Sequence, residues 1–570
     1  MKKLTFGTPE ACTPTRYCKD LRLEETDVSY PVHRIEFRLT SGGCLLKLPF
    51  DPGEHIYGLG LQLRAFDLSG RKFTLRPNAD PITPTGDSHA PVPFFVSTAG
   101  YGVYVDTARH AEFYFGANTA LRKRTPTGEV KEVATSTSEL YSSEVTEEAC
   151  ITVRIPAAKG VDIYIFEGNT VTDVVAKYNM FSGGGCDVPA WALSAVYRCY
   201  GKYDQEEVAQ MARYLKENGF SVGTVGLEPG WQSHAYPCTF CWNPEKFPEP
   251  QKLIRELLDM GFRISLWEHM FTHPASPIYE KLFPYSADHE VWKGLVPDFS
   301  IPEARAVFAD HHKNLVESGI DAFKLDECDG SDVTGSWSYP NFTEFPGGMD
   351  GEQYHSMAGV LYMQAILEAL DGRPTLSQVR NAGALSAPYP FVLYSDLYDS
   401  RDFIRGCAVS GFSGILWAPE VRDTVSRTKE EFLRRLQNNV FSVQCMINSW
   451  YCKDAPWIEL GCAEEVKYWL NVRESLVPML KEAFERYSRT GVPPVRALVS
   501  DYSDDENTYA IADQYLFCEK LLVAPIEVGK KGRKLYLPRG SWVDFFTGEP
   551  APNGWFEIET DSIPVYRLTD

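Results

Sequence analysis

The sequence lacks several features that would each place it in a different class of protein. No apolar run is long enough to cross a bilayer, and residues 1–9 lack the apolar stretch of a signal peptide. No block of Lys and Arg stands out in a chain of net charge −21, which argues against a nucleic-acid partner, because phosphates require a basic surface. The 14 cysteines follow no framework of spacings, so we expect reduced thiols and a cytoplasmic protein.

Cofactor motifs are also scarce. Cys238 and Cys241 have the spacing of metal ligands, but no second pair lies nearby, so zinc is not expected. Gly58-Leu59-Gly60 is not followed by a helix and therefore predicts a turn rather than a dinucleotide loop. No Gly-x-Ser-x-Gly elbow occurs in a strand–turn–helix context. We expect neither a metal nor an organic cofactor.

The pattern of apolar and polar residues along the chain predicts three domains. With 570 residues, the chain exceeds what one core needs. Residues 1–187 alternate apolar and polar side chains, as at 32–39 and 102–106, which predicts a β-sandwich. Three glycines at 183–185 predict a linker. Alternation returns in residues 489–570 and predicts a small C-terminal β-sheet domain.

Residues 188–488 follow a different plan, in which an amphipathic helix, a glycine and an apolar strand repeat. The first unit starts at Asp204, an expected N-cap with Glu207 at N3, and reaches Gly219 before its strand. Such alternation builds a parallel sheet by right-handed crossovers. About eight strands fit, the number that closes a (β/α)₈ TIM barrel: 195–200, 221–228, 263–268, 321–326, 375–379, 391–396, 414–417 and 443–448.

Reactive groups in such barrels lie at the C-terminal ends of the strands, and an open doubly wound sheet would use the same ends. The polar or aromatic residues expected there are Glu228, Trp267, Glu268, Asp326, Arg380, Asp396 and Asn448. His311 and His312 lie on the polar face of a predicted helix, so we expect them to be solvated.

Asp326 is the candidate with the clearest chemistry. It ends the strand Phe323-Lys324-Leu325-Asp326, with Lys324 two residues earlier on the same face. A nearby ammonium would keep the carboxylate ionised, as a nucleophile must be. On pattern alone, a helix-capping aspartate after a strand is an equally good interpretation.

Several segments in order resemble glycoside hydrolase family 31, the α-glucosidase and α-xylosidase family. The nucleophile motif resembles Phe323–Glu327, and the region from a sugar-binding arginine to the acid/base aspartate resembles residues 380–396. Residues 295–305, 403–406 and 410–414 are similar to further barrel segments. Outside the barrel, residues 56–60, 93–103, 521–525 and 535–542 resemble the N-terminal sandwich and the C-terminal domain of the family.

The resemblance implies a retaining mechanism with Asp326 as nucleophile and Asp396 as general acid and then base. Their carboxyl groups would lie about 5–5.5 Å apart. Asp399 and Asp402 are rivals for the acid role, because the loop after Asp396 is shorter than in the family. Arg380 would hold the nucleophile or a sugar hydroxyl; a structural salt bridge is its alternative role.

Other positions depart from the family pattern and leave the sugar open. Glu228 replaces an aspartate that grips distal hydroxyls and is followed by Trp231, and Asn448 replaces a histidine. The segment from Trp417 to Glu420 differs from the usual Trp-Ser-His-Asp. Such a site could accept an axial 4-hydroxyl, so α-galactosides join α-glucosides and α-xylosides as candidate substrates. The candidate platforms on which a sugar could stack are Trp267, Trp417 and Trp450, each of which could instead pack in the core. The candidate loop residues over the barrel mouth are Asp80 and Asp87.

The expected function is exo-hydrolysis of an α-linked sugar from a small oligosaccharide or glycoside by double displacement. A transglycosylase would use the same residues, and a non-catalytic sugar-binding protein is the alternative from another class. The expected partner is a small carbohydrate, with no nucleic acid and no membrane. The sequence is compatible with a homo-oligomer as well as with a monomer.

Overall fold

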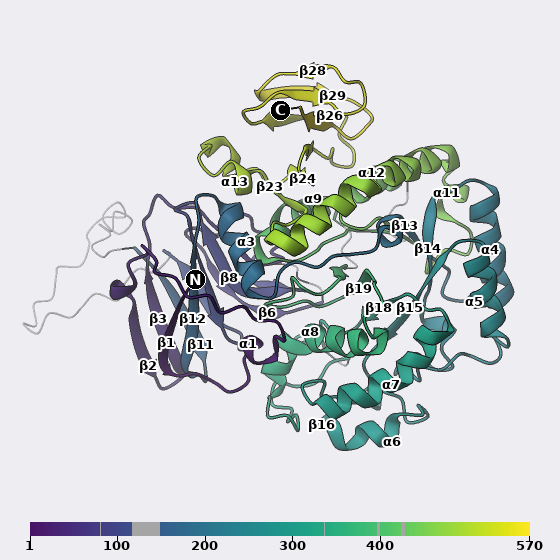
Figure 1. Cartoon of the computed structure of the whole chain (residues 1–570), viewed down its shortest axis with the longest axis horizontal. Helices are drawn as coiled ribbons and strands as arrows, with labels where there is room; N and C mark the ends of the chain where they lie inside the picture. The colour runs from purple at the N-terminus through teal and green to yellow at the C-terminus, as the bar shows by residue number, and fades with distance from the viewer. Residues whose placement is uncertain are drawn as a thin grey trace, which may run out of the picture.

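A computed structural model describes residues 1–79, 81, 83–116, 149–335, 337–395, 399–422 and 428–569 of the chain. The N-terminal part forms two packed five-stranded sheets, as the alternating pattern predicts (Figure 1). One sheet has the order β1-β12-β9-β8-β4, formed by Lys2–Thr8, Lys159–Glu167, Tyr101–Asp106, Pro91–Ser97 and Ile56–Gly60. The other has the order β2-β3-β11-β10-β5, formed by Glu36–Thr40, Gly43–Pro49, Cys150–Pro156, Glu112–Phe115 and Lys72–Thr74.

The sandwich has a hydrophobic cluster of its own and shares a second cluster with the rest of the molecule. Helix α3 (Val171–Phe181), which the strand pattern does not predict, follows the sandwich and begins with a capping box at Thr170. The ring of Phe94 stacks on Tyr178 of this helix at 4.0 Å. Tyr57 of the sandwich stacks on Phe412, which lies in the central domain, at 5.0 Å. The two domains therefore meet through buried aromatic packing rather than through a solvated linker.

The central domain is a closed eight-stranded barrel. Its parallel sheet has the order β20-β19-β18-β15-β14-β13-β22-β21. The two edges are joined by a parallel bridge between Leu393 of β20 and Trp417, which lies just before β21. The prediction of a TIM barrel is confirmed. The strands are Ala195–Arg198 (β13), Val222–Leu227 (β14), Arg263–His269 (β15), Ala322–Asp326 (β18), Ser377–Val379 (β19), Phe391–Leu393 (β20), Glu420–Arg422 (β21) and Met446–Asn448 (β22).

The seventh strand differs from the prediction of 414–417. The backbone around Trp417 pairs with β20, whereas residues 420–422 pair with β22. Pro419 separates the two segments, and a proline has no N–H to donate to a sheet ladder. The seventh strand therefore lies after the proline, at Glu420–Arg422, and the predicted segment contributes only the bridge from Trp417 to β20.

Helices surround the barrel, and their ends follow local sequence signals. Helix α4 has the expected capping box between Asp204 and Glu207. Gly219, Gly261 and Gly319 follow α4, α5 and α7 with positive φ angles of 72°, 91° and 114°, which glycine adopts without steric cost. The longer helices are Gln205–Glu217 (α4), Pro250–Asp259 (α5), Pro302–Ser318 (α7), Gly351–Leu370 (α8), Ser400–Val409 (α9), Lys429–Val440 (α10) and Ala463–Thr490 (α12).

The C-terminal part is a small β domain that lies beside α12 (Figure 1). Its six-stranded sheet, in spatial order, is formed by Val495–Ala497 (β23), Tyr515–Phe517 (β24), Leu521–Val523 (β25), Val565–Leu568 (β30), Trp542–Asp544 (β27) and Pro550–Ala551 (β28). A two-stranded sheet of Gly532–Leu537 (β26) and Gly554–Glu559 (β29) completes it.

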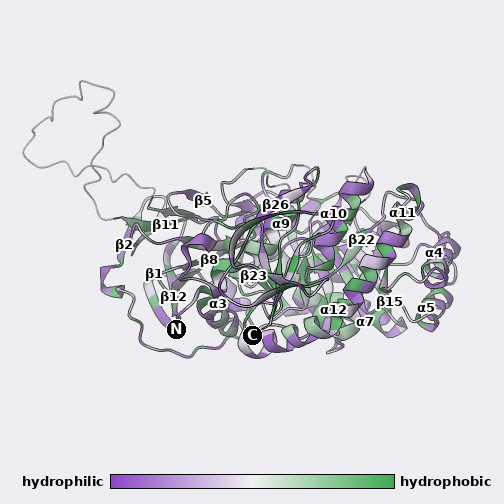
Figure 2. Cartoon of the chain, turned by 90° about the horizontal axis from the view of Figure 1, so that it is seen from above, coloured by the Kyte–Doolittle hydropathy of each residue, from purple (hydrophilic) through white to green (hydrophobic). Residues whose placement is uncertain are grey.

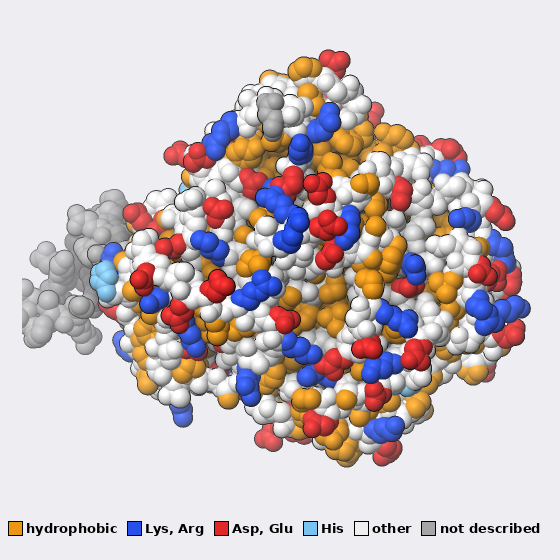
Figure 3. All heavy atoms as spheres, viewed as in Figure 1, with side chains coloured by type: hydrophobic (Ala, Val, Ile, Leu, Met, Phe, Trp, Pro, Cys, Tyr) orange, Lys and Arg blue, Asp and Glu red, His pale blue; other side chains and the backbone are white. Residues whose placement is uncertain are grey.

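Polarity is distributed as expected for a folded globular chain. Hydrophobic residues concentrate inside the molecule, while hydrophilic residues mark outer helices such as α4 and α5 (Figure 2). On the face shown in Figure 3, acidic and basic side chains are interspersed. Among the described residues, no helix has the length and hydropathy required to cross a membrane. All 14 cysteines are free thiols.

Candidate active site

The C-terminal ends of the barrel strands bring together most of the predicted site residues. Asp326 is the last residue of β18 and lies beside His269 of β15. Trp267 pairs in register with Lys324, so their side chains follow the same alternation along neighbouring strands. Strand polarity therefore places an aromatic ring, an ammonium group and a carboxylate at one end of the barrel.

Asp326 is held by three hydrogen-bond donors. The indole Nε1 of Trp267 donates to Oδ2 at 2.7 Å, and the backbone N–H of Glu327 donates to Oδ1 at 3.0 Å. A guanidinium nitrogen of Arg380 lies 3.4 Å from Oδ1. An ionised carboxylate only accepts hydrogen bonds, so three donors match that form. The side chain of Asp326 is 12% exposed, so the carboxylate is mostly buried but not sealed from solvent.

The backbone turns sharply directly after Asp326. Glu327 has a φ of 54°, in the left-handed region that costs a non-glycine residue about 1 kcal/mol. Such strained residues gather at functional sites, where the surrounding contacts hold them in place. The turn points the Glu327 N–H at the carboxylate of Asp326.

Lys324 has partners other than the expected one. Its ammonium lies 3.4 Å from Glu228 and 3.6 Å from Glu420, and 4.6 Å above the ring of Tyr394. The cation that contacts Asp326 is Arg380. The expected ammonium of Lys324 therefore forms no direct ion pair with Asp326. Alternation puts both side chains on one face, but Lys324 reaches Glu228, which follows β14, and Glu420, the first residue of β21.

Glu228 lies in a buried cluster of charges. It follows β14 and is bonded by Arg198 of β13 as well as by Lys324. Burial acts to raise the pKa of Glu228, but the charges of Lys324 and Arg198 outweigh it, so the pKa is lowered. Arg198 also donates to Ser265 at 3.1 Å. Sequence reasoning missed Arg198, although a lone arginine in an apolar strand was a visible signal.

Glu420 is the first residue of β21, and Asn448 is the last residue of the adjacent strand β22. The amide of Asn448 donates to Glu420, which also pairs with Lys324. The backbone N–H of Trp450 donates to the side-chain oxygen of Asn448 at 3.0 Å. The positions that depart from the family pattern, Glu228, Glu420 and Asn448, thus share one polar network.

The tryptophans differ in their access to the barrel mouth. Trp231 is buried and donates to the backbone oxygen of Trp267 at 2.6 Å. Trp417 is buried, and a Cβ on Gly406 would come within 2.4 Å of its indole. Trp267 is buried with its N–H on Asp326, whereas Trp450 is half-buried and contacts Tyr451 at 4.3 Å. Core packing therefore accounts for Trp231 and Trp417 better than sugar stacking does.

The acid/base candidates have different surroundings. Asp396 and the loop residue Asp80 lie outside the described residues. Asp399 is exposed and caps α9 by accepting from the backbone N–H of Arg401 at 2.8 Å. Asp402 is buried and binds Arg64 of the sandwich at 3.1 Å; burial, with help from Asp399, raises its pKa despite Arg64.

Two further residues connected to Asp326, namely Asp329 and His89, were not predicted from the sequence. Asp329 accepts from Nε of Arg380 at 3.0 Å and pairs with His89 at 2.8 Å. Burial acts to raise the pKa of Asp329, but the charge of Arg380 and the hydrogen bond from His89 lower it. His89 belongs to the sandwich, where Asp87 instead pairs with Arg76. Asp329 stands three residues after Asp326, but His89 carries no signal in the local sequence.

Glu268 and His312 face away from the barrel mouth. His312 is buried, with Nε2 at 3.0 Å from Glu268, which also accepts from the hydroxyl of Tyr362 at 2.8 Å. The prediction that His312 is solvated is wrong, because α7 carries it against α8 and β15. Glu268 alternates with Trp267 on the strand and so points to the opposite face.

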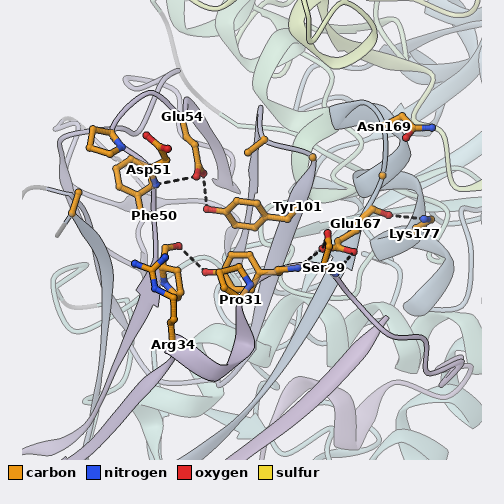
Figure 4. Close-up of a pocket in the computed structure, with 17 residues that line it drawn as sticks. Ser29, Pro31, Arg34, Phe50, Asp51, Glu54, Tyr101, Glu167, Asn169 and Lys177 are labelled. Carbon is orange, nitrogen blue, oxygen red and sulfur yellow. Dashed lines mark hydrogen bonds between the residues drawn. The ribbon is translucent and has the colours of Figure 1, made fainter.

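A hollow of about 1060 Å³ lies in the sandwich, away from these strand ends (Figure 4). Its carboxylates are engaged by neighbouring side chains and backbone. Glu54 accepts from the hydroxyl of Tyr101 at 2.7 Å, and Glu167 accepts from the hydroxyl of Ser29 at 2.8 Å. The hollow has the size of a ligand pocket, but it lacks the donors and acceptors that converge on Asp326.

Comparison with known proteins extends over all three domains. Residues 186–483 match the glycosyl hydrolases family 31 TIM-barrel domain. Residues 491–568 match the glycosyl hydrolase family 31 C-terminal domain, and residues 29–113 match the glycosyl hydrolase 31 N-terminal galactose mutarotase-like domain.

Individual relatives are distant. An α-xylosidase of Emericella nidulans is 24% identical, over 92% of this chain and 67% of that protein. α-Glucosidase 2 of Bacillus thermoamyloliquefaciens is also 24% identical, with the same coverage of 92% and 67%. The chain spans about two thirds of the length of the curated relatives it matches.

The fold agrees with solved structures. A Flavobacterium johnsoniae GH31 dextranase complexed with glucose superposes with a TM-score of 0.79 at 18% identity, over 93% of this chain and 67% of that one. The barrel match, residues 186–483, covers more than half of the 570 residues. The chain belongs to glycoside hydrolase family 31 and is a glycoside hydrolase.

Proposed function

We propose that the protein is a retaining exo-α-glycosidase with Asp326 as its nucleophile. The observation that carries the proposal is the carboxylate of Asp326 at the end of β18, which accepts from Trp267, Arg380 and the Glu327 backbone. The donors fix the carboxylate in one orientation at the barrel mouth. Positioning of this kind is what a nucleophile needs, because reacting atoms must lie close and aligned.

The reaction proceeds in two displacements. Asp326 attacks the anomeric carbon while Asp396, assigned from the family resemblance, protonates the departing glycosidic oxygen. A covalent glycosyl ester forms on Asp326. Asp396 then removes a proton from water, which attacks the same carbon and releases the sugar with its original anomeric configuration. The two carboxyl groups balance every proton, so no cofactor enters the scheme.

Glu228, Lys324, Glu420 and Asn448 are the proposed contacts to the hydroxyls of the terminal sugar. The network offers acceptors and donors within one buried cluster, and such groups discriminate strongly between sugars that do and do not satisfy them. We propose an α-galactoside or α-glucoside as substrate. The relatives named α-xylosidase and α-glucosidase support an α-linked sugar of this general shape.

Kinetics on 4-nitrophenyl α-glycosides test the proposal. The panel comprises the galactoside, glucoside, xyloside and N-acetylgalactosaminide. The wild type should cleave at least one, and NMR should show that the sugar is first released as the α-anomer. Equal inactivity on all four, or release of the β-anomer, would contradict the proposal.

The variant Asp326→Ala should lose several orders of magnitude in kcat, because the covalent step has no replacement. Asp321→Ala is a matched control. Asp321 lies just before β18 at its other end and pairs with Arg263 at 3.2 Å, so its removal should leave turnover nearly intact. Near-normal turnover of Asp326→Ala would place the nucleophile elsewhere.

A transglycosylase is the alternative that uses the same residues. It would yield more transfer product than free sugar at high substrate concentration, since a second sugar would compete with water for the same ester.

A further inference from the structure

A chain of buried polar contacts leads from the N-terminal sandwich to Asp326. His89 lies between β7 (Asp87–Ser88) and β8 of the sandwich, and its Nδ1 is 2.8 Å from Oδ2 of Asp329. The same oxygen of Asp329 accepts from Nε of Arg380 at 3.0 Å. Another nitrogen of Arg380 lies 3.4 Å from Asp326. Three successive contacts therefore connect one domain to the proposed nucleophile of another.

We propose that His89 is a positioning residue, which holds Asp326 in its reactive geometry through Asp329 and Arg380. The inference rests on the proposed function of Asp326. His89 is too remote for a direct role, because Asp329 and Arg380 stand between it and the carboxylate. Its contribution is to fix the partner of the arginine.

The planar geometry of Arg380 makes the position of its nitrogen near Asp326 depend on the position of Asp329. The guanidinium is a rigid planar fork, so the nitrogen that faces Asp329 determines where the other nitrogens point. Asp329 engages Nε, which leaves a terminal nitrogen aimed at Asp326. A shift of Asp329 would rotate the fork and withdraw the donor from Asp326.

Burial strengthens the contacts that join His89, Asp329 and Arg380. His89 and Asp329 are both fully buried, and Arg380 is 5% exposed. A carboxylate without water needs donors, and Asp329 has two of them on Oδ2. Loss of either would leave a poorly compensated charge, which a buried site relieves by moving its neighbours or by taking up a proton.

The backbone of His89 is tied to the same loop. Asn381, next to Arg380, donates from its side-chain amide to the carbonyl of His89 at 2.8 Å. The side-chain oxygen of Asn381 accepts from the N–H of Gly359 in α8 at 3.1 Å. A Cβ on Gly359 would lie 1.9 Å from the backbone oxygen of Asn381, so glycine permits this close approach. The sandwich loop and the arginine are therefore clamped together at two points.

The first experiment compares His89→Leu with His89→Asn in the full chain. Leucine removes the donor to Asp329, whereas the Nδ2 of asparagine can occupy the place of Nδ1. We expect His89→Leu to lower kcat by about 100-fold with little change in KM, the scale of a small misplacement of reacting groups. His89→Asn should recover most of that loss. His55→Leu is the matched control, because His55 forms a similar pair with Asp67 in the same domain.

The second readout separates positioning from mere stability. Asp329→Asn keeps the shape and an acceptor for Arg380 but removes one negative charge near Asp326. The acidic limb of kcat/KM should shift to lower pH, because one negative charge fewer then stands beside Arg380 at the reacting centre. An acidic limb that stays in place, or an equal loss of kcat in His55→Leu and His89→Leu, would overturn the inference.

A structural readout is independent of turnover. In a crystal structure of His89→Leu, the guanidinium nitrogen of Arg380 should move out of hydrogen-bonding range of Asp326. An unchanged contact would refute the positioning role even if the variant were slow. Inactivity of the wild type on all glycosides would instead refute the proposed function, while the structural comparison would still decide the role of His89.

Discussion

At the scale of single residues, the two cations near Asp326 have separate tasks. Arg380 bridges Asp326 and Asp329, whereas Lys324 bridges Glu228 and Glu420. The reaction centre and the sugar-recognition cluster therefore have different counter-ions. Changes in the recognition cluster can alter the preferred sugar while the nucleophile keeps its own donors.

The identity of the acid/base can be tested with leaving groups. Asp396→Ala should slow hydrolysis of an alkyl α-glycoside far more than that of a 2,4-dinitrophenyl α-glycoside, whose leaving group departs without protonation. Asp399→Ala and Asp402→Ala should affect both substrates alike, since Asp399 caps α9 and Asp402 binds Arg64. Steady-state kinetics on the two substrates measure the difference. A leaving-group dependence in Asp402→Ala would move the acid role to that residue.

The Glu228 cluster should make stability depend on pH. The folded pKa of Glu228 is lowered, so its ionised form stabilises the fold above the unfolded value near 4.5, and this contribution is lost as the pH falls through the folded pKa. Glu228→Gln should cost about 3 kcal/mol at pH 7, because Lys324 and Arg198 lose a buried partner.

Thermal unfolding at several pH values measures this effect. The difference in Tm between wild type and Glu228→Gln should narrow as the pH is lowered below 4.5. Glu206→Gln, at a side chain that is 66% exposed, should show a small difference throughout. A gap that stays constant with pH would mean that ionisation of Glu228 does not contribute to stability.

Local sequence signals mark Asp326 but not the residues around it. Asp326 was predictable because a strand-ending carboxylate has a local signature and barrels place such ends at the site. The partners of Lys324 could not be predicted, because Glu228 follows β14 and Glu420 begins β21, both far from Lys324 in the sequence. His89 could not be found at all, since its role arises from domain packing rather than from any nearby residue.

At the scale of elements, helix ends and strand positions were the most predictable features. The capping box of Asp204 and the glycines after α4, α5 and α7 act locally, so they can be recognised without tertiary information. The seventh strand was misplaced because its pairing changes partner at Pro419, and only the closed barrel determines which neighbour each half meets.

Gly219 and Gly319 allow the cost of backbone strain to be separated from the cost of side-chain crowding. Gly219 has positive φ and open space around its Cβ position, so Gly219→Ala should cost about 1 kcal/mol through backbone strain alone. At Gly319 a Cβ would lie 2.9 Å from Ile254 and 3.0 Å from Leu258. Gly319→Ala should therefore lower Tm more than Gly219→Ala does in calorimetry. Equal losses would show that the side chains of α5 yield freely.

At the scale of the whole molecule, one hydrophobic cluster runs from the sandwich into the barrel, beside a second cluster that the sandwich forms on its own. Tyr57 and Phe66 of the sandwich contact Phe412 at 5.0 and 5.9 Å, and the backbone N–H of Gly60 donates to Ser413 at 3.0 Å. Such packing couples the folding of the two domains, and it also presents His89 to Asp329. The sandwich therefore helps to position the residues of the site, although the residues proposed for catalysis lie in the barrel.

This coupling predicts how the protein unfolds. Phe412→Ala should remove about 3–5 kcal/mol, because it leaves a cavity between two domains. Calorimetry of the wild type should show the sandwich and the barrel unfolding in one transition, and Phe412→Ala should lower or divide that transition. Phe283→Ala, at a ring that is 61% exposed, should leave it in place. If Phe412→Ala shifted only the barrel transition, the sandwich would fold independently, and the domain packing could not be what holds His89 against Asp329.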